Sequence, residues 1–361
     1  MKIQLQKLSL LILWVISQSC SSKPETTESF DNLVLENTTT EKVLPDTLDQ
    51  QLIISDGSRM IAFDSCIVIL SDKVDSYLTL VNLRNNEISE AGMKGRGVGE
   101  LIMAYSLVRS PLEGYFEVYD IGLRAIMRYN LDSCLNDPKG YIPKKIDMIR
   151  PSGMSFFSYS GKEYISLGNS RIIGQGIFND RYRWSIYDTK DRVFNYAYEY
   201  TFDPEDQSEN IFKSMAYQGS TMAMGDKVVW VCWYSPIMET YMLREDTLAL
   251  VNSIQHGTVK YEATREGGGV GSALKMGNQM GFTTIDVDED YIYALYSGKV
   301  KTKENPYSDG SSNKILIYDW EGDFVKGCKL DEEIICLTKM PNKNRLYGIS
   351  TNSGELLTFE I

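Results

Sequence analysis

Histidine is almost absent from this sequence of 361 residues, in which His256 is the only one. A metal site built from several histidines is therefore excluded, and any Ser-His-Asp arrangement would have to use His256. The Gly-x-Ser-x-Gly pattern that surrounds a hydrolase nucleophile is also missing. The sequence therefore predicts no catalytic residue, no metal and no cofactor.

Cysteine is also scarce, and its pattern does not suggest a disulfide framework. Apart from Cys20, the chain holds five cysteines, an odd number: Cys66, Cys134, Cys232, Cys328 and Cys336. Most of them lie inside or beside apolar runs, which is typical of small buried side chains. A disulfide between Cys328 and Cys336, the only two close in sequence, remains open.

Basic residues are outnumbered, because 37 lysines and arginines face 49 aspartates and glutamates, giving a formal net charge of −12. Nucleic acids are bound mainly through Lys and Arg contacts to phosphate, so this balance argues against a nucleic-acid partner. It suits a protein exposed to water outside the cytoplasm.

No apolar run is long enough to cross a membrane, which needs roughly 20 residues. Leu8–Ile16 is a short apolar core that follows Lys2 and Lys7, and Cys20 stands after a few small polar residues. The segment resembles a bacterial lipoprotein signal, and an ordinary secretory signal with an incidental cysteine is the alternative. We expect residues 1–19 to be a signal peptide, Cys20 to carry the lipid, and the protein to lie in the bacterial cell envelope.

A polar stretch follows the predicted lipid site. Residues 20–45 are rich in Ser, Thr, Glu and Asn, a composition that buries too little surface to fold and predicts a flexible tether. Asp46-Thr47-Leu48 resembles a bacterial O-glycosylation acceptor, with Thr47 as the modified residue. The folded domain is expected over residues 46–361.

Helical periodicity is lacking after the signal, and short alternating apolar runs replace it. At the C-terminus, residues 315–318 and 324–330 flank a Trp-Glu-Gly-Asp turn, which predicts a β-hairpin. Three more short strands are expected at 334–339, 345–349 and 355–361. Between residue 55 and the end, such strands fall into six groups, of which the first five hold four strands each and the last holds three.

The six groups span roughly 45–60 residues each, which matches the four-stranded blades of a β-propeller, since a blade commonly needs about 40–50 residues. The sequence thus predicts an all-β fold, a six-bladed β-propeller. Its three-stranded last blade would be closed by an N-terminal strand, since this removes an open edge. Leu52-Ile53-Ile54, or the earlier Leu33-Val34-Leu35, is the expected closing strand. A pair of packed β-sandwiches is the alternative architecture.

Three motifs carry a resemblance to a known family: Gly95-Arg96-Gly97-Val98-Gly99-Glu100-Leu101, the pattern at 315–324, and the strand at 345–350. They resemble the TolB-like six-bladed propeller lipoproteins of Bacteroidetes, over roughly residues 50–361. Pro and Phe are usual in that family where Val98 and Leu101 stand. The resemblance implies a propeller of the binding type and carries no catalytic set.

One end of the predicted propeller collects the long connections. Strands alternate in direction within a blade, so links between blades emerge at the same end as loops between second and third strands. Two Gly-rich links, at 95–99 and 265–271, would lie there, together with the loops 169–182, 235–239 and 298–313. Long loops on one face of a rigid scaffold are common binding sites. The candidate binding face comprises Arg96, Glu100, Arg181, Tyr182, Trp233, Tyr234 and Arg265.

Two local patterns have plainer explanations. Gly95–Gly99 departs from a dinucleotide-binding fingerprint, because Glu100 stands where its last glycine belongs, and a turn with positive φ explains it. Asp286–Asp290 lacks the glycine and the distant glutamate of an EF-hand calcium loop and suits an acidic hairpin turn.

Two functions follow. The first is a non-catalytic binding or scaffolding module, a monomeric propeller that recognises an envelope protein, a peptide or a glycan. The second is a propeller hydrolase or lyase acting on saccharides, whose carboxylates would come from different blades and leave no local pattern. The scarcity of histidine and the lack of a catalytic signature favour the first.

Overall fold

The computed structural model describes residues 38–40, 43–44, 52–54, 57–147, 159–168, 170–266, 269–305 and 310–361. All of them belong to one unit, Asn37–Ile361. The predicted signal peptide, Cys20, the apolar island at 33–35 and Thr47 lie outside the described residues.

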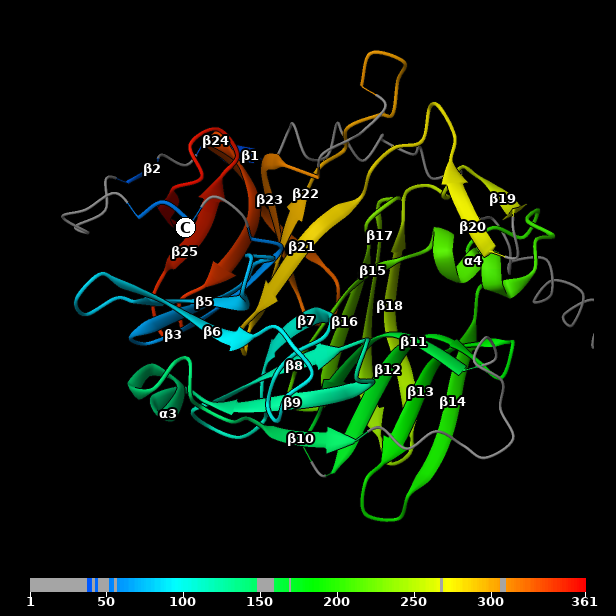
Figure 1. The fold of residues 1–361 in the computed structure, drawn as a ribbon. Coiled ribbons are helices and arrows are strands. Elements are labelled where there is room, and N and C mark those ends of the chain that lie inside the picture. The colour runs from blue at the N-terminus through cyan, green and yellow to red at the C-terminus, as the bar shows by residue number, and fades with distance from the viewer. Residues whose placement is uncertain are drawn as a thin grey trace, which may run out of the picture. The chain divides into compact units, whose positions relative to one another are not determined.

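The strands form a closed ring of six blades (Figure 1). Each blade contributes one innermost strand, and each innermost strand contacts the next around the ring. In order, these strands are β3, β7, β11, β15, β21 and the second half of β24, which contacts β3 and so completes the circle. The predicted all-β, six-bladed propeller is therefore confirmed.

Blades 1 to 4 are four-stranded antiparallel sheets, each made from one continuous stretch of chain. Blade 1 contains β3 (Arg59–Phe63), β4 (Cys66–Leu70), β5 (Ser76–Asn82) and β6 (Glu87–Met93), and blade 2 contains β7 (Ala104–Arg109), β8 (Tyr115–Asp120), β9 (Ala125–Asn130) and β10 (Lys144–Asp147). Blade 3 contains β11 (Tyr159–Ser166), β12 (Arg171–Phe178), β13 (Tyr182–Asp188) and β14 (Val193–Glu199), and blade 4 contains β15 (Gly219–Met224), β16 (Lys227–Cys232), β17 (Ile237–Arg244) and β18 (Thr247–Gln255).

Blades 5 and 6 share one long strand, β24 (Phe324–Lys339). Its first half pairs with β23, and its second half pairs with β25, with a register shift between Ile334 and Leu337. Blade 5 contains β21 (Phe282–Val287), β22 (Tyr291–Tyr296), β23 (Ser312–Asp319) and the first half of β24, and blade 6 contains its second half, β25 (Arg345–Ser350) and β26 (Leu356–Glu360). The two strands expected at 324–330 and 334–339 are thus one continuous strand.

An N-terminal segment closes blade 6, as predicted, and it includes strands that lie before the expected closing segment at 52–54. Antiparallel β2 (Val43–Leu44) pairs with β26, and parallel β1 (Thr38–Thr40) pairs with β24. The expected closing segment at 52–54 pairs beside the start of β26: Ile53 bridges Glu355, the Ile54 N–H donates to the Gly354 carbonyl at 2.8 Å, and the Leu356 N–H donates to the Leu52 carbonyl at 2.9 Å. Leu52 and Ile54 are also buried in the core, which explains their apolar character. The sheet therefore begins within residues 20–45, where a tether is predicted.

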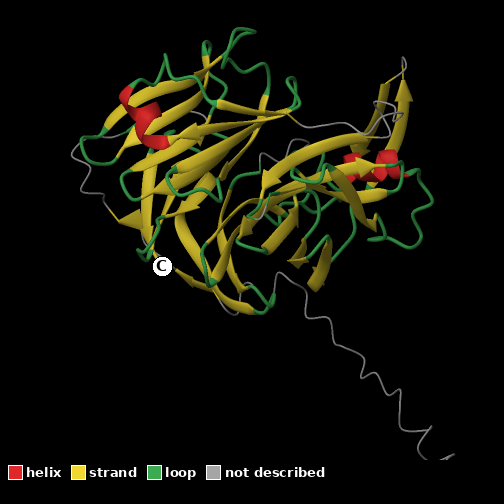
Figure 2. Cartoon of the chain, turned by 90° about the horizontal axis from the view of Figure 1, so that it is seen from below, coloured by secondary structure: helices red, strands yellow, loops and turns green. Residues whose placement is uncertain are grey.

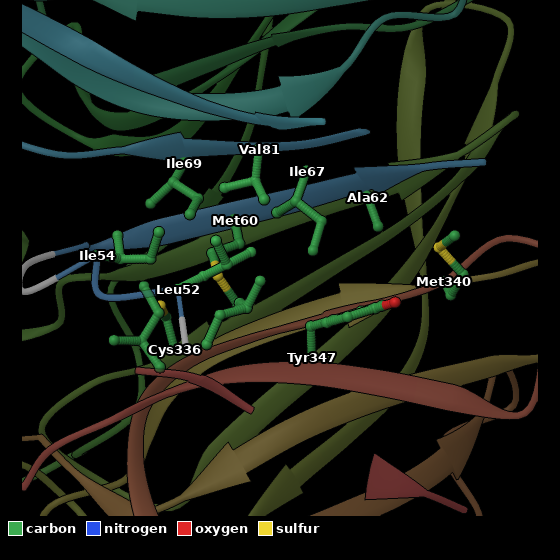
Figure 3. Packing of buried hydrophobic residues seen from close by; sticks show 12 residues of the cluster. Leu52, Ile54, Met60, Ala62, Ile67, Ile69, Val81, Cys336, Met340 and Tyr347 are labelled. Carbon is green, nitrogen blue, oxygen red and sulfur yellow. The ribbon is translucent and has the colours of Figure 1, made fainter. Parts of the chain in front are cut away.

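The hydrophobic core lies between neighbouring blades. Figure 3 shows one cluster, in which Met60 and Ile67 of blade 1 face Cys336 and Tyr347 of blade 6, with Leu52 beside them. Similar clusters join blades 5 and 6 and blades 2 and 3. Burying each such side chain stabilises the fold by roughly 1.5–3 kcal/mol, so the ring is held together by contacts between sheets.

Within the described residues, two helices interrupt the strands, contrary to the expectation of none after the signal (Figure 2). They are α3 (Leu131–Asn136) and α4 (Asn210–Ala216). The expected strand at 215–217 falls on α4, because a helix of only seven residues leaves almost no periodic signal. A hairpin of β19 (Tyr261–Glu266) and β20 (Gly269–Leu274) is inserted between blades 4 and 5, where a strand at 258–261 and a Gly-rich turn were expected.

The insertion expected at 169–182 is also wrong, since most of it is strand β12. Two glycines, Gly174 and Gly176, interrupt the apolar pattern that would indicate a strand there. A side chain at Gly174 would come within 2.3 Å of the Tyr164 ring, so the glycine is required by packing rather than by a turn.

The five cysteines after Cys20 are buried free thiols. Cys328 and Cys336 form no disulfide, which settles the alternative left open by the sequence. Burial raises the pKa of Cys66, Cys232 and Cys336 to about 12, so these thiols stay neutral and behave as apolar side chains.

Within the described ranges, no helix is long and apolar enough to span a membrane.

Ring closure gives the first testable prediction. A chain starting at residue 46 lacks β1 and β2, so it should unfold at lower guanidinium chloride concentration than a chain starting at residue 37. We expect a loss of roughly 0.5–1.5 kcal/mol for each backbone hydrogen bond removed, and a greater tendency to aggregate through the exposed β26 edge. Equal unfolding midpoints would show that these strands do not close the ring.

Candidate functional site

The topology defines two ends of the ring. We call one end the link face; it carries the links between blades and the loops between second and third strands. The other end, the turn face, carries the loops between first and second and between third and fourth strands. The innermost strands run from the link face to the turn face.

A buried ion pair spans the ring near the turn face. Arg109 on β7 binds Asp286 on β21 through two hydrogen bonds of 2.5 and 2.9 Å. Asp286 also accepts hydrogen bonds from the Thr338 hydroxyl and the Lys339 N–H on β24, at 2.6 and 2.7 Å. Arg109 reaches back to the Ala62 carbonyl on β3 at 3.1 Å. Burial alone would lower the pKa of Arg109, but the Asp286 carboxylate outweighs it and raises that pKa.

A second ion pair lies nearer the link face. Arg59 on β3 is paired with Glu163 on β11, and both side chains are buried. The other Glu163 oxygen accepts the Thr221 N–H on β15 at 2.8 Å. We call these two sets the channel ion pairs. Together they connect all six innermost strands.

The channel ion pairs leave the two buried carboxylates of the innermost strands fully engaged. Both oxygens of Asp286 and both oxygens of Glu163 accept hydrogen bonds from protein groups. A glycosidase needs one carboxyl group to donate a proton and a second to act as base or nucleophile, both facing the substrate. These two groups face protein donors instead.

The acidic residues of the stretch 286–290 have different structural roles. Asp286 belongs to the channel, while Asp288 accepts hydrogen bonds from the Asp290 and Tyr291 N–H groups and from the Tyr293 hydroxyl. The acidic turn expected from the sequence is therefore observed at Asp288.

Helix α4 organises one side of the link face (Figure 1). The Asn210 side chain donates to the Asp180 carbonyl at 3.2 Å, joining the helix to the β12–β13 loop. Directly after the helix, the Gln218 carbonyl accepts the Trp233 N–H at 2.9 Å, joining it to the β16–β17 loop. The inserted hairpin packs on the helix through Ser272, whose hydroxyl donates to the Phe212 carbonyl at 2.7 Å.

These contacts bring five of the seven predicted binding-face residues around one helix. We call this region the α4 platform; it comprises α4, the β19–β20 hairpin, and the residues Arg181, Tyr182, Trp233 and Tyr234. Arg265, on the hairpin, completes the five. The sequence predicted their common face, but it did not predict the helix that gathers them.

Trp233 and Tyr234 are half-buried, and their rings meet edge to face with centroids 6.2 Å apart. The Trp233 indole N–H donates to the Ser220 hydroxyl at 2.8 Å, which fixes the ring. Gly281 packs against this loop so closely that a Cβ would lie 2.0 Å from the Ser235 carbonyl. The pair is therefore a rigid aromatic feature that leaves part of each ring open to solvent.

The two arginines of the α4 platform are exposed and already paired with acids. Arg181 binds Glu199 at 2.6 Å and lies over the Tyr182 ring, 5.6 Å from its centroid. Arg265 contacts both oxygens of Glu209 at 2.8 Å and covers the Phe212 ring. Exposed ion pairs contribute little to stability, so a partner can replace these carboxylates at small cost.

Arg96 and Glu100 lie elsewhere on the link face, in the connection between blades 1 and 2. The Glu100 carboxylate accepts the Gly97 N–H at 2.6 Å and so folds over its own loop. Gly95 and Gly99 have positive φ values of 157° and 82°, which accounts for the glycines. Gly99 also packs against Ile142 and Pro143 of blade 2. The contacts of this loop are thus with blades 1 and 2, and the α4 platform belongs to blades 3 and 4.

A cavity of about 430 Å³ adjoins the α4 platform. It lies between the link 203–208 and the base of the inserted hairpin, and Tyr261 bridges them through a 2.6 Å hydrogen bond to Asp206. Its lining mixes three acids with Lys260 and Lys275.

Tyr105 lies near the start of β7, at the link-face end of this innermost strand. Burial raises its pKa to about 12, and Arg59, Glu163 and Tyr234 all act on its hydroxyl electrostatically.

Sequence reasoning missed the channel ion pairs, because their partners come from different blades. Only Asp286 stood out, and it did so as part of an acidic turn. An arginine, threonine or carboxylate within an otherwise apolar innermost strand was the available signal, as at Arg59, Glu163 and Arg109.

The geometry is that of a closed six-bladed β-propeller with an occupied channel and loop-built faces. A sequence model of the family described as TolB-like 6-blade propeller-like matches residues 142–340, more than half of the chain. The chain therefore belongs to this TolB-like propeller family.

A solved structure with a TM-score above 0.5 supports the same fold. A DUF4221-family member from Bacteroides vulgatus ATCC 8482 is 12% identical, with a TM-score of 0.52 over 90% of this chain and 96% of that one. A putative exported protein from Bacteroides fragilis NCTC 9343 is 11% identical, with a TM-score of 0.48 over 89% and 93%. No curated protein matches the sequence. A β-propeller fold supports a binding or scaffolding role in general.

The channel ion pairs give the second prediction. Asp286→Ala leaves Arg109 without its carboxylate and should destabilise the protein by about 3–5 kcal/mol, because an uncompensated buried charge is costly. Equilibrium unfolding in guanidinium chloride measures this loss.

Asp323→Ala, at an exposed turn, is the matched control and should change stability by no more than about 0.5 kcal/mol. A similar small change for Asp286→Ala would contradict the structural role of the pair.

Proposed function

We propose that this protein is an exported, lipid-anchored binding module of the Bacteroidetes type, which holds an envelope protein, a peptide or a glycan on the link face of its propeller. The α4 platform carries this proposal, because it gathers five of the predicted binding-face residues around one helix. The partner contacts Trp233 and Tyr234 first, since they are the fixed aromatic side chains there.

Binding is favoured over saccharide cleavage by the state of the channel. The two buried carboxylates of the innermost strands are held by arginines and backbone N–H groups, so neither faces a substrate. A rigid ring with an occupied channel suits a scaffold whose loops hold a partner.

Aromatic and arginine side chains are the residues that most often dominate binding energy. The α4 platform offers both, with Arg181 stacked on Tyr182 and Arg265 on Phe212. Arg96 and Glu100 form a second, separate part of the proposed face and extend it over blades 1 and 2. The propeller acts as a monomer, with the tether and Cys20 holding it at the membrane.

The lipid anchor gives the third prediction. Cys20→Ala should abolish labelling by radioactive palmitate and move the protein from the membrane fraction to the soluble fraction of its cells. Ser21→Ala, the neighbouring control, should leave both unchanged. Labelling that persists in Cys20→Ala would refute the anchor at this residue.

The binding face gives the fourth prediction. The protein is used to capture partners from its own cell envelope, with a glycan array run beside it, and the affinity of the captured partner is then measured. The triple variant Arg181→Ala, Trp233→Ala, Arg265→Ala should weaken binding by at least about tenfold, or 1.4 kcal/mol.

Lys139→Ala with Lys190→Ala removes two exposed cations from the turn face and serves as the control. Its affinity should equal that of the unmodified protein. If the control weakens binding and the triple variant does not, the partner binds the opposite face and the proposal fails.

A further inference from the structure

Two cavities adjoin on the turn face, away from the α4 platform. The central cavity, of about 360 Å³, lies where β7, β11, β15 and β21 end. The lateral cavity, of about 450 Å³, lies between blades 2 and 3. Pro111, Ser166, Leu167 and Gly168 line both cavities, so they adjoin along these residues. We call the two together the turn-face groove.

The lateral cavity is positively charged. Among the described residues, its lining includes Arg128, Lys144, Lys145 and Arg171 but no Asp or Glu, in a protein whose net charge is −12. Arg128 is held from behind by Glu117, whereas Lys144 and Lys145 are exposed at the rim. Such a concentration of cations attracts a negatively charged group.

Arg171 is placed to exchange one of its partners. It is paired with Asp188 and, at 2.6 Å, with Asp246, whose side chain is 60% exposed. Because an exposed ion pair is weak, a ligand carboxylate can take the place of Asp246 while Asp188 keeps the guanidinium oriented.

The central cavity is apolar. Val108, Ile165, Leu167, Met222 and Val287 contribute to its lining, and Arg109 lies among them, bound to Asp286. Methionine adapts to ligands of varied shape, and Met222 and Met224 both line this cavity. The groove thus offers an apolar recess directly beside a cationic one.

The lining distinguishes between classes of ligand. In the part of the chain that the structure describes, no aromatic side chain lines either cavity, so a saccharide would find no ring to stack on there. Ser166 lies at the junction with its hydroxyl buried and, within the described residues, without a hydrogen-bond partner. A fatty acid carries a single carboxylate at the end of its chain, whereas a peptide can present several carboxylates to Lys144, Lys145 and Arg171 beside an apolar side chain.

We propose that the turn-face groove binds a peptide segment in which acidic side chains stand next to an apolar one. The apolar side chain enters the central cavity, the carboxylates contact Lys144, Lys145 and Arg171, and the peptide backbone crosses the junction between the two cavities. This site is separate from the α4 platform and does not depend on the function proposed for it.

Gly168 allows the groove to be blocked without disturbing the fold. A Cβ built on Gly168 meets no atom within 4 Å, and its φ lies outside the left-handed region. Because Gly168 lines both cavities, Gly168→Leu places a side chain in the space between them.

The fifth prediction concerns peptide selection. A random-peptide phage library is selected on the full-length protein, and the enriched peptides are synthesised and titrated by calorimetry. We expect sequences with Asp or Glu beside Leu, Ile, Val or Met, and affinities that fall as salt is raised. Lys144→Glu with Lys145→Glu should weaken binding at least about tenfold, and so should Gly168→Leu.

Lys275→Glu with Lys303→Glu reverses the same number of exposed charges on the link face and should leave peptide affinity unchanged. The triple variant of the α4 platform should also bind these peptides normally, which separates this test from that of the proposed function.

Three results would overturn the proposal: no enrichment, enriched peptides without acidic residues, or a Lys144→Glu, Lys145→Glu variant that binds like the unmodified protein. Sodium oleate is titrated in parallel, as an apolar anion without a peptide backbone. If oleate displaces the selected peptides at equal concentration, the groove accepts amphiphilic anions in general and the peptide assignment is wrong.

Discussion

The ion pairs across the channel are the interaction on which the rest of this structure depends. Six sheets meet at the axis of the ring, and their innermost side chains must either fill that space or leave it to water. Arg109 with Asp286, and Arg59 with Glu163, fill it with charge. Because a buried charge without its partner is costly, each pair specifies which strands must face each other. The Thr221 N–H and the Thr338 hydroxyl extend these contacts to the two remaining innermost strands, β15 and the second half of β24.

A channel occupied in this way leaves function to the two ends of the propeller. The link face carries the larger insertions, and α4 turns them into one surface by joining the loops of blades 3 and 4 to the inserted hairpin. Apart from the connection that contains α3, the turn face has short connections, and the ends of the innermost strands leave an apolar recess there, beside a cluster of cations. The two faces therefore differ in chemistry: aromatic rings and paired charges on one, apolar and cationic cavities on the other.

Much of the fold was predictable, because alternation of apolar residues and turn chemistry act locally. The blades, the missing last strand and the common face of Arg181, Trp233 and Arg265 all follow from local pattern and strand direction. Short or irregular elements were not predictable in this way. Gly174 hides strand β12, α4 is too short to show a helical period, and Val43–Leu44 is a two-residue strand in a polar segment.

The site was less accessible to sequence reasoning for a different reason. The partners of Arg59 and Arg109 lie 104 and 177 residues away, so only the closed ring brings them together. The turn-face groove is likewise assembled from short turns of separate blades, none of which is unusual by itself. Distance along the chain, rather than weak local signal, is what concealed these contacts.

Native-state hydrogen exchange tests the central claim, that the channel ion pairs make the six blades one cooperative ring, most directly. Amides in β3, β7, β11, β15, β21 and the second half of β24 should open only with global unfolding, and so with a common free energy. If the innermost strand of any blade exchanges through a separate opening of clearly lower free energy, the ring is not a single unit and the account is contradicted.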